Sequence, residues 1–100
     1  MSVTLTSKQR AYLMSLATNL DVILNIGKAS LTDEIIDAVN ETFNTRELIK
    51  IGVLKNCIDD PRSIAEAIAE NTHSTVVKVI GKKIILYKMD RDNQKIMLPK

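Results

Sequence analysis

The residues with the clearest chemical use lie together in one short stretch, residues 25–32. There Gly27, Lys28 and small residues separate an apolar run, residues 22–26, from an amphipathic segment that starts at Leu31. A compact strand-to-helix loop directs backbone N–H groups and one positive side chain to the same side, and the helix N-terminus adds free amides and the favourable end of its dipole. The stretch therefore predicts a phosphate-binding loop, although most glycine-containing loops between a strand and a helix are plain connections.

The rest of the sequence offers no catalytic or metal-binding constellation. The single histidine, His73, has no nucleophile and base beside it and is better placed to cap the end of a helix. The acid pairs at 33–34 and 59–60 lie at expected helix starts, where capping explains them. With Cys57 as the only cysteine, a small residue expected to be packed, the usual Cys/His spacing of a metal site cannot be built. The P-loop and dinucleotide-binding fingerprints are missing too, so we expect neither an enzyme nor a cofactor.

The composition is that of one ordinary globular domain. Of its 100 residues, 45% are hydrophobic and 26% are charged, which suits one modest core and argues against disorder. The longest apolar runs are far too short to span a membrane, and the first residues lack the basic and apolar regions of a signal peptide. A single cysteine excludes an internal disulfide and fits a reducing compartment. We expect a cytoplasmic monomer without a membrane partner or a small-molecule substrate.

Positive charge is concentrated in the last quarter of the chain. Residues 1–75 carry seven bases and ten acids, a balance of −3, whereas residues 76–100 carry seven bases and two acids, a balance of +5. Such a gradient indicates a polyanionic partner on one side of the molecule, although basic C-termini are also common as solvating segments. The three aromatic residues are too few for stacking bases on a sheet. If the partner is a nucleic acid, the lysines would therefore recognise its backbone and shape rather than stack on its bases.

Alternating helices and strands must position these groups. A capping box of Thr6 and Gln9 starts the first helix, Asp60 and Pro61 suit the start of the third, and Gly81 allows a tight hairpin turn. Periodicity predicts helices over 6–19, 31–44 and from 61 to about 71–74, and strands over 21–26, 47–55, 75–80 and 83–89. The order α-β-α-β-α-β-β predicts an α/β domain with three helices packed on a four-stranded mixed sheet, in which three strands are parallel and the last is antiparallel.

Alternation within the strands assigns side chains to the two faces of the sheet. Lys50 is expected on the face opposite to that of Ile49 and Ile51. Val77 and Val79 are expected to share a face. Because the lysine-bearing faces also carry aliphatic residues, we expect such a face to be only partly covered. Residues 1–89 should form the domain, and residues 90–100 a polar, loosely attached tail.

Five segments of the chain occur in one characteristic order. They read LTSKQR (5–10), IGKASLT (26–32), RELIKI (46–51), VLKN (53–56) and VIGKKIILYK (79–88). In this order they resemble the CRM domain, the chloroplast RNA splicing and ribosome maturation module, in its stand-alone bacterial YhbY-like form. The resemblance covers nearly the whole chain, and even the tail segment KIMLP (95–99) fits it. Each motif alone is weak, so the strength of the resemblance lies in the set.

The resemblance implies an RNA-binding protein that associates with precursors of the large ribosomal subunit and takes part in ribosome assembly. It also implies a fold similar to the C-terminal domain of translation initiation factor three. Members of the family carry a GxxG loop, as in KH domains, which here begins at Gly27 and ends at Ser30. Serine adopts positive φ less readily than glycine, and its Cβ blocks the closest backbone approach. Either the loop does not need glycine at Ser30, or its RNA contact is weakened.

The candidate RNA-binding residues are the four residues of this loop together with basic side chains of the strands, their connections and the first helix. They are Gly27, Lys28, Ala29, Ser30, Lys50, Lys55, Lys78, Lys82, Lys83, Lys88, Lys8 and Arg10. The expected partner is structured RNA, namely ribosomal RNA of large-subunit precursors. The alternative is a protein-interaction adaptor that uses the acidic second helix or the exposed sheet face. A small DNA-binding domain shares the charge argument but not the resemblance.

Overall fold

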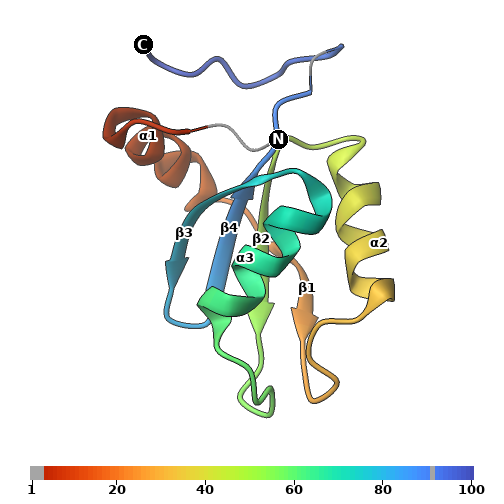
Figure 1. Cartoon of the computed structure of the whole chain (residues 1–100). Helices are drawn as coiled ribbons and strands as arrows, with labels where there is room; N and C mark the ends of the chain where they lie inside the picture. Colours follow the sequence, from red (N-terminus) through yellow and green to blue (C-terminus); the bar gives the residue numbers. More distant parts are fainter. Residues whose placement is uncertain (1–3, 91) are drawn as a thin grey trace.

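Helices and strands follow one another in the predicted order. The computed structural model describes residues 4–90 and 92–100. Its elements are α1 (Ser7–Ala17), β1 (Val22–Ile26), α2 (Asp33–Phe43), β2 (Leu48–Val53), α3 (Pro61–Thr72), β3 (Thr75–Ile80) and β4 (Lys83–Tyr87), as Figure 1 shows. Every predicted element is present, and the observed bounds differ from the predicted ones only at the ends of elements.

Short local signals set the ends of the helices. Thr6 and Gln9 form the predicted capping box, with Oγ1 of Thr6 accepting from the Gln9 N–H at 3.1 Å and Oε1 of Gln9 accepting from the Thr6 N–H at 3.0 Å. Asp60 caps α3 and Pro61 is its first residue, as predicted. Each N-cap of this kind contributes about 1 kcal/mol. His73 ends α3 in the left-handed conformation, with a φ of 56°, and its backbone N–H donates to a carbonyl of the last turn.

The sheet has the strand order β1-β2-β4-β3. β1 pairs with β2 in parallel, and β4 is antiparallel to both β2 and β3. The prediction of three strands in one direction and an antiparallel last strand is therefore confirmed. The β3–β4 hairpin, whose turn residue Gly81 has a φ of 55°, folds back so that β4 lies between β2 and β3. This leaves β1 and β3 as the two edges.

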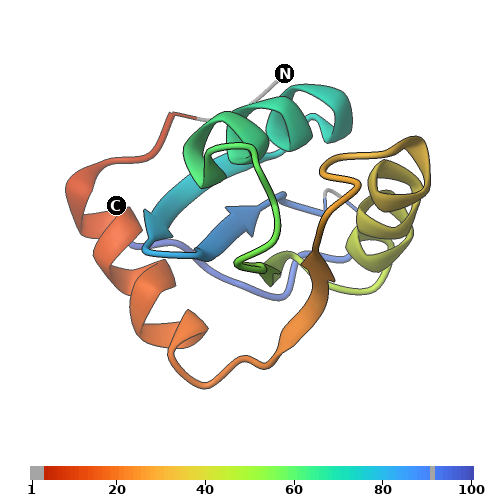
Figure 2. The same ribbon diagram turned by 90° about the horizontal axis from the view of Figure 1, so that it is seen from below.

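Different parts of the chain cover the two faces of the sheet. Figure 2 shows α1 on one side of the sheet and α2 and α3 on the other. The α2–α3 side holds the larger core, in which Ile51, Ile68 and Ile84 are fully buried. Leu13 of α1 and Tyr87 of β4 lie in a second cluster on the α1 side. Burial of one such side chain contributes about 1.5–3 kcal/mol, so both faces stabilise the sheet.

A β-bulge between Val76 and Lys78 changes the side-chain pattern of β3. Val77 packs with the α1-side cluster, whereas Val79 packs with the α2–α3 core. The prediction that Val77 and Val79 share a face is therefore wrong. One extra residue on one strand reverses the alternation beyond it, and period-two patterning alone does not reveal such an insertion.

The C-terminal tail is attached at Glu47, whose side chain is only 3% exposed. The Glu47 carboxylate accepts hydrogen bonds from the backbone N–H groups of Asp90, at 2.8 Å, and of Lys95 and Ile96, both at 2.7 Å. Ile96 and Leu98 pack against the α1-side cluster. The segment that the sequence predicts to be a loosely attached tail thus has a defined attachment point, and its mobility stays a prediction.

Candidate nucleic-acid interface

The turn from Gly27 to Ser30 is closed by its own backbone. The Ser30 N–H donates to the Gly27 carbonyl oxygen at 2.9 Å, which leaves Lys28 and Ala29 exposed at the tip. Ser30 has a φ of 59°, a left-handed conformation that costs a non-glycine residue about 1–2 kcal/mol. Its hydroxyl donates to the Asp59 carboxylate, and this charge-assisted hydrogen bond offsets part of the cost. The loop thus adopts at Ser30 the conformation that glycine favours, although the residue is serine.

The loop between β2 and α3, residues 54–60, packs beside this turn. The Leu54 N–H donates to the last carbonyl of β1 at 2.8 Å. The Cys57 side chain is buried, as predicted, with its Sγ 3.8 Å from Oγ of Ser30. A Cβ built on Gly27 would lie 3.5 Å from its nearest neighbours, an ordinary contact, so space alone does not demand glycine there. The two loops therefore support each other and hold the turn in one conformation.

Three connections meet at one end of the sheet, at the bottom of Figure 1: the β1–α2 loop, the β2–α3 loop and the β3–β4 hairpin. Each carries an exposed lysine, namely Lys28, Lys55 and Lys82, termed here the loop-end lysines. The Val53 N–H donates to the Lys82 carbonyl at 2.8 Å and holds the hairpin against the end of β2. The fold thus brings together three positive charges that lie far apart in the sequence.

A second group of lysines lies on the α1 side of the sheet. Lys50 and Lys78 are the cross-strand neighbours of Ile85, which belongs to the α1-side cluster, and Lys83 lies two residues before Ile85 on the same face. Lys78 and Lys83 are exposed, so α1 covers this face only in part. Lys50 is half-buried, and its Nζ donates to the Leu20 carbonyl at 3.3 Å. Lys50, Lys78 and Lys83 are termed the sheet-face lysines.

The remaining basic candidates lie elsewhere. Lys88 follows β4 at the opposite end of the sheet from the loop-end lysines, with its Nζ 6.0 Å from the centroid of the Phe43 ring. Lys8 is exposed in the first turn of α1. Nη1 of Arg10 donates to the carbonyl oxygen of Val77 at 2.6 Å and to that of the preceding residue at 2.8 Å. Arg10 therefore holds α1 on the bulge of β3, a structural role that the sequence did not reveal.

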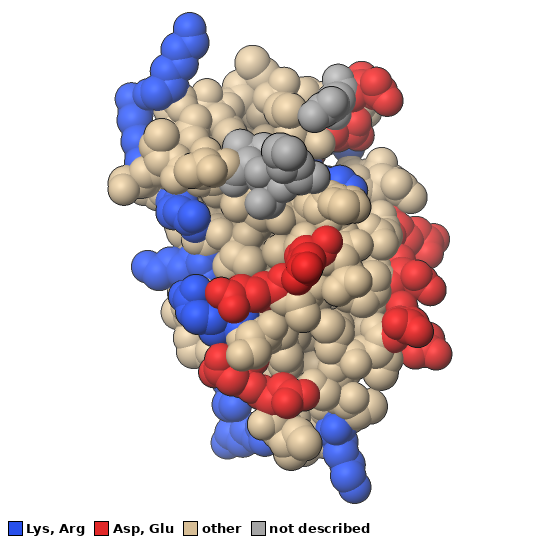
Figure 3. Space-filling model, in the orientation of Figure 1, with Lys and Arg blue, Asp and Glu red and all other residues tan. Residues whose placement is uncertain are grey.

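Acidic side chains lie on α2 and α3, and Asp59 and Asp60 add two more in the β2–α3 loop. Figure 3 shows them over α2 and α3, with lysine and arginine side chains along the β3 edge and at the loop end. The segment SKQRAYLMSLA that forms α1 contains no acid. Asp33 and Glu34 occupy the first turn of α2, where they complement the helix dipole and compete with any phosphate. The attraction for a polyanion therefore comes from the lysines rather than from the helix N-terminus behind the loop.

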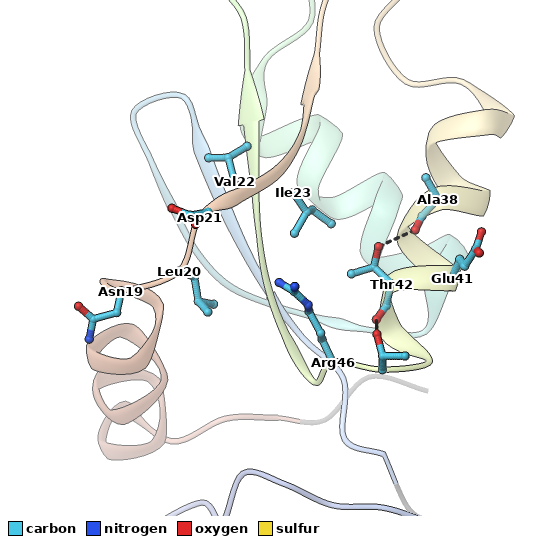
Figure 4. A pocket seen from close by; sticks show the side chains of 10 residues that line it. Asn19, Leu20, Asp21, Val22, Ile23, Ala38, Glu41, Thr42 and Arg46 are labelled. Atoms are coloured by element: carbon cyan, nitrogen blue, oxygen red, sulfur yellow. Dashed lines mark hydrogen bonds between the residues drawn. The ribbon is translucent and has the colours of Figure 1, made fainter.

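A groove beside the β1 edge, drawn in Figure 4, has mixed charge. Arg46 points into it, and Asp21 and Glu41 also line it. The Thr42 hydroxyl on its α2 wall donates to the Ala38 carbonyl at 2.9 Å. Two acids beside one base make this groove a poor match for a polyanion.

A second groove, beside the β3 edge, is more basic. Arg10, Arg62 and Lys78 line it together with one acid, Glu66. Arg62 was not among the predicted candidates. Its only distinction in the sequence is its place directly after the proline that starts α3, and that position carries no functional signal.

Two further classes of site are not found in the part of the chain that the structure describes. Within residues 4–90 and 92–100, histidine, cysteine, aspartate and glutamate side chains form no group that could hold a metal ion. No helix in these ranges has the length and apolar character of a membrane span.

Comparison with known proteins decides the family. The family model of the CRS1/YhbY (CRM) domain matches residues 5–88. The chain belongs to this family. The matched range runs from the residue before the α1 cap to the residue after β4, so the CRM domain comprises every helix and strand described above, and the resemblance noted in the sequence is confirmed.

Relatives of this CRM domain cover almost the whole chain. It is 41% identical over 95 residues to the probable RNA-binding protein YqeI of Bacillus subtilis, which covers 95% of this chain and 99% of that protein. It is 31% identical to an RNA-binding protein of Haemophilus influenzae, which covers 97% of both chains. The solution structure of the protein SAV1595 from Staphylococcus aureus matches with a TM-score of 0.80 and 44% identity, over 96% of this chain and 100% of that one. The fold is thereby confirmed, and the names of both relatives describe RNA binding rather than an enzymatic activity.

Proposed function

We propose that this CRM domain binds structured RNA through its phosphate backbone. The observation that carries the proposal is the placement of the loop-end lysines at one end of the sheet and of the sheet-face lysines on its α1 side, where α1 contributes no acid. Lys28 and Ala29 form the exposed tip of the β1–α2 turn, where an RNA strand can approach the protein backbone. The RNA-binding relatives support the same class of partner.

Lysine contacts of this kind have a measurable signature. Each phosphate that a lysine neutralises releases counterions, and about six such contacts lower the affinity about a thousandfold between about 50 and 200 mM salt. The binding should also depend on RNA shape more than on base sequence, because the chain has three aromatic residues in all and so offers few rings for stacking. Duplex DNA of equal length should compete more weakly than RNA if the shape of the RNA is what the protein recognises.

We further propose that the bound RNA is ribosomal RNA in precursors of the large ribosomal subunit. In this proposal the protein assists ribosome assembly in the cytoplasm as a monomer, without catalysing a reaction. The support is the resemblance of the five ordered segments to the stand-alone bacterial form of the family. A tagged copy of the full chain should migrate with large-subunit precursors in a sucrose gradient and leave those fractions after ribonuclease treatment.

The decisive experiment measures binding of the full chain to a labelled, structured fragment of large-subunit ribosomal RNA over a range of salt concentrations. The expected result is tight binding at low salt with a steep negative salt slope. Undetectable or salt-independent binding would overturn the proposal.

Protein interaction is the second candidate function, and the acidic outer face of α2 favours it. Asp37 and Glu41 continue the acidic face that Asp33 and Glu34 begin, and such a face suits a basic protein partner. A protein complex that persists after ribonuclease treatment would support this function, whereas complete release would exclude it.

A further inference from the structure

The groove beside the β3 edge combines a basic rim with an apolar floor. It lies between α1 and α3, and the apolar residues Met14 and Val77 are part of its lining. Val77 is buried in the α1-side cluster and Met14 is half-buried, so the floor is part of the packed core and does not need to form on binding. Its volume of about 870 Å³ is within the range of small-ligand sites and leaves room for one nucleotide.

The charges of the rim favour a phosphate at one end of the groove. Arg62 and Lys78 are exposed, and their side chains make no hydrogen bond or ion pair with residues 4–90 and 92–100. Glu66, one turn further along α3, is the one acid of the lining and repels a phosphate from its own end. A phosphate is therefore favoured between Arg62 and Lys78, where the arginine offers paired N–H donors and the lysine a point charge.

The edge of β3 is unsuited to the other common occupant, an added peptide strand. A strand that pairs with an edge needs a regular row of free backbone groups. Here the bulge interrupts the row, and Arg10 already occupies the carbonyl oxygens of Val76 and Val77. The groove thus offers side-chain cations and an apolar floor, but no backbone ladder.

We infer that this groove holds a single unpaired nucleotide of the bound RNA. Its phosphate lies between Arg62 and Lys78, and its base lies on the apolar surface around Met14. The inference rests on the proposed RNA binding and adds to it a preference for RNA with an unpaired base. Lys78 belongs both to the sheet-face lysines and to the lining of the groove. An RNA backbone bound along the sheet-face lysines therefore leads directly into the groove.

The test uses two labelled RNA duplexes of equal length, one fully paired and one with a single unpaired adenosine. Wild-type protein should bind the second about tenfold more tightly, an advantage worth about 1.4 kcal/mol. Arg62→Gln should reduce this preference to less than about twofold while changing affinity for the paired duplex little. Arg46→Gln is the matched control, since it removes the same charge from the groove at the opposite edge of the sheet and should leave the preference intact.

The outcomes separate the two proposals. If the wild-type protein binds neither RNA, the proposed function fails. If it binds both equally, or if Arg62→Gln and Arg46→Gln have equal effects, the function stands and the nucleotide site is overturned. In a second measurement, 4-thiouridine at the unpaired position should crosslink to a peptide that contains Met14 or Val77, and a crosslink confined to another part of the chain would equally overturn the site.

Discussion

The Ser30 hydroxyl donates a hydrogen bond to the Asp59 carboxylate, and this bond joins the turn after β1 to the loop before α3. It explains how serine occupies a position where the backbone favours glycine, with a φ of 59°. The bond also fixes the turn that carries Lys28 relative to the loop that carries Lys55. The two loops that carry these lysines are thus joined before any RNA binds.

Replacement of Ser30 by glycine should have little net effect on stability. Relief of the left-handed strain offsets the lost hydrogen bond and the greater freedom of the unfolded chain, so urea denaturation should show a change in the free energy of unfolding below about 1 kcal/mol. RNA affinity should be equal or stronger, because the Cβ no longer limits backbone approach. Asp59→Ala, which leaves the strain without the hydrogen bond, should cost about 1 kcal/mol. A marked loss of RNA affinity in Ser30→Gly would contradict this account of the loop.

Lys28→Gln and Lys88→Gln remove the same charge from opposite ends of the sheet. Lys28 lies on the exposed turn, so its loss should weaken RNA binding about three- to tenfold and reduce the salt slope by about one. Lys88 lies near Phe43, away from the loop end, and its loss should change affinity less than about twofold. Fluorescence anisotropy with one RNA measures both variants, and equal losses would show that the loop end has no special part in binding.

Arg10→Ala should destabilise the fold more than it weakens RNA binding. The guanidinium bonds two carbonyl oxygens at the β3 bulge, and the loss of these hydrogen bonds should lower the free energy of unfolding by about 1–3 kcal/mol. Lys8→Ala, on the same helix and without such bonds, should stay within about 0.5 kcal/mol of wild type. Chemical denaturation measures the free energy of unfolding of both variants. Similar values for the two would contradict the structural role assigned to Arg10.

Glu47→Ala should release the C-terminal tail. The buried carboxylate accepts three backbone hydrogen bonds from the tail, and their loss should cost about 3 kcal/mol or more. Hydrogen exchange at the Lys95 and Ile96 amides should become fast, while the Ile51 amide in β2 should stay protected. Continued protection of the two tail amides would show that Ile96 and Leu98 hold the tail without Glu47. The exposed acid Glu41 offers the control, Glu41→Ala, which should leave tail exchange unchanged.

Tyr87→Phe should change how stability depends on alkaline pH. Burial, with a smaller contribution from the Glu47 charge, raises the pKa of Tyr87 above its ordinary value of 10.0. The folded state therefore favours the protonated phenol, so this contribution to stability is complete below pH 10 and declines as the pH rises towards the folded-state pKa, by up to about 1.4 kcal/mol per pH unit. The variant should lack this decline.

At neutral pH, Tyr87→Phe should be as stable as wild type or slightly more stable. The Tyr87 hydroxyl is buried and has no hydrogen-bond partner in the described part of the chain, and an unsatisfied polar group of this kind costs about 1–3 kcal/mol. Tyr12→Phe is the control, because Tyr12 is 39% exposed and its loss should leave the alkaline decline in place. Thermal melts from pH 7 to 11 compare the variants, and an unchanged decline in Tyr87→Phe would show that another group causes it.

The sequence by itself determined the order and approximate bounds of the helices and strands. Its signals are local: a capping box needs only Thr6 and Gln9, a helix start needs only Asp60 and Pro61, and a buried face shows in the spacing of neighbouring residues. The family followed from the sequence for a related reason, because five short segments keep a characteristic order along the chain.

Tertiary structure alone decided which of these elements and charges meet. The place of β4 between β2 and β3, the bulge that separates Val77 from Val79, and the division of the basic candidates into loop-end, sheet-face and distant groups have no local signal. The same holds for the hydrogen bonds from Ser30 to Asp59 and from the tail to Glu47, which join residues 29 and 43–49 positions apart. Such contacts depend on how the sheet packs and pairs as a whole, and neither the spacing nor the type of single residues records that packing.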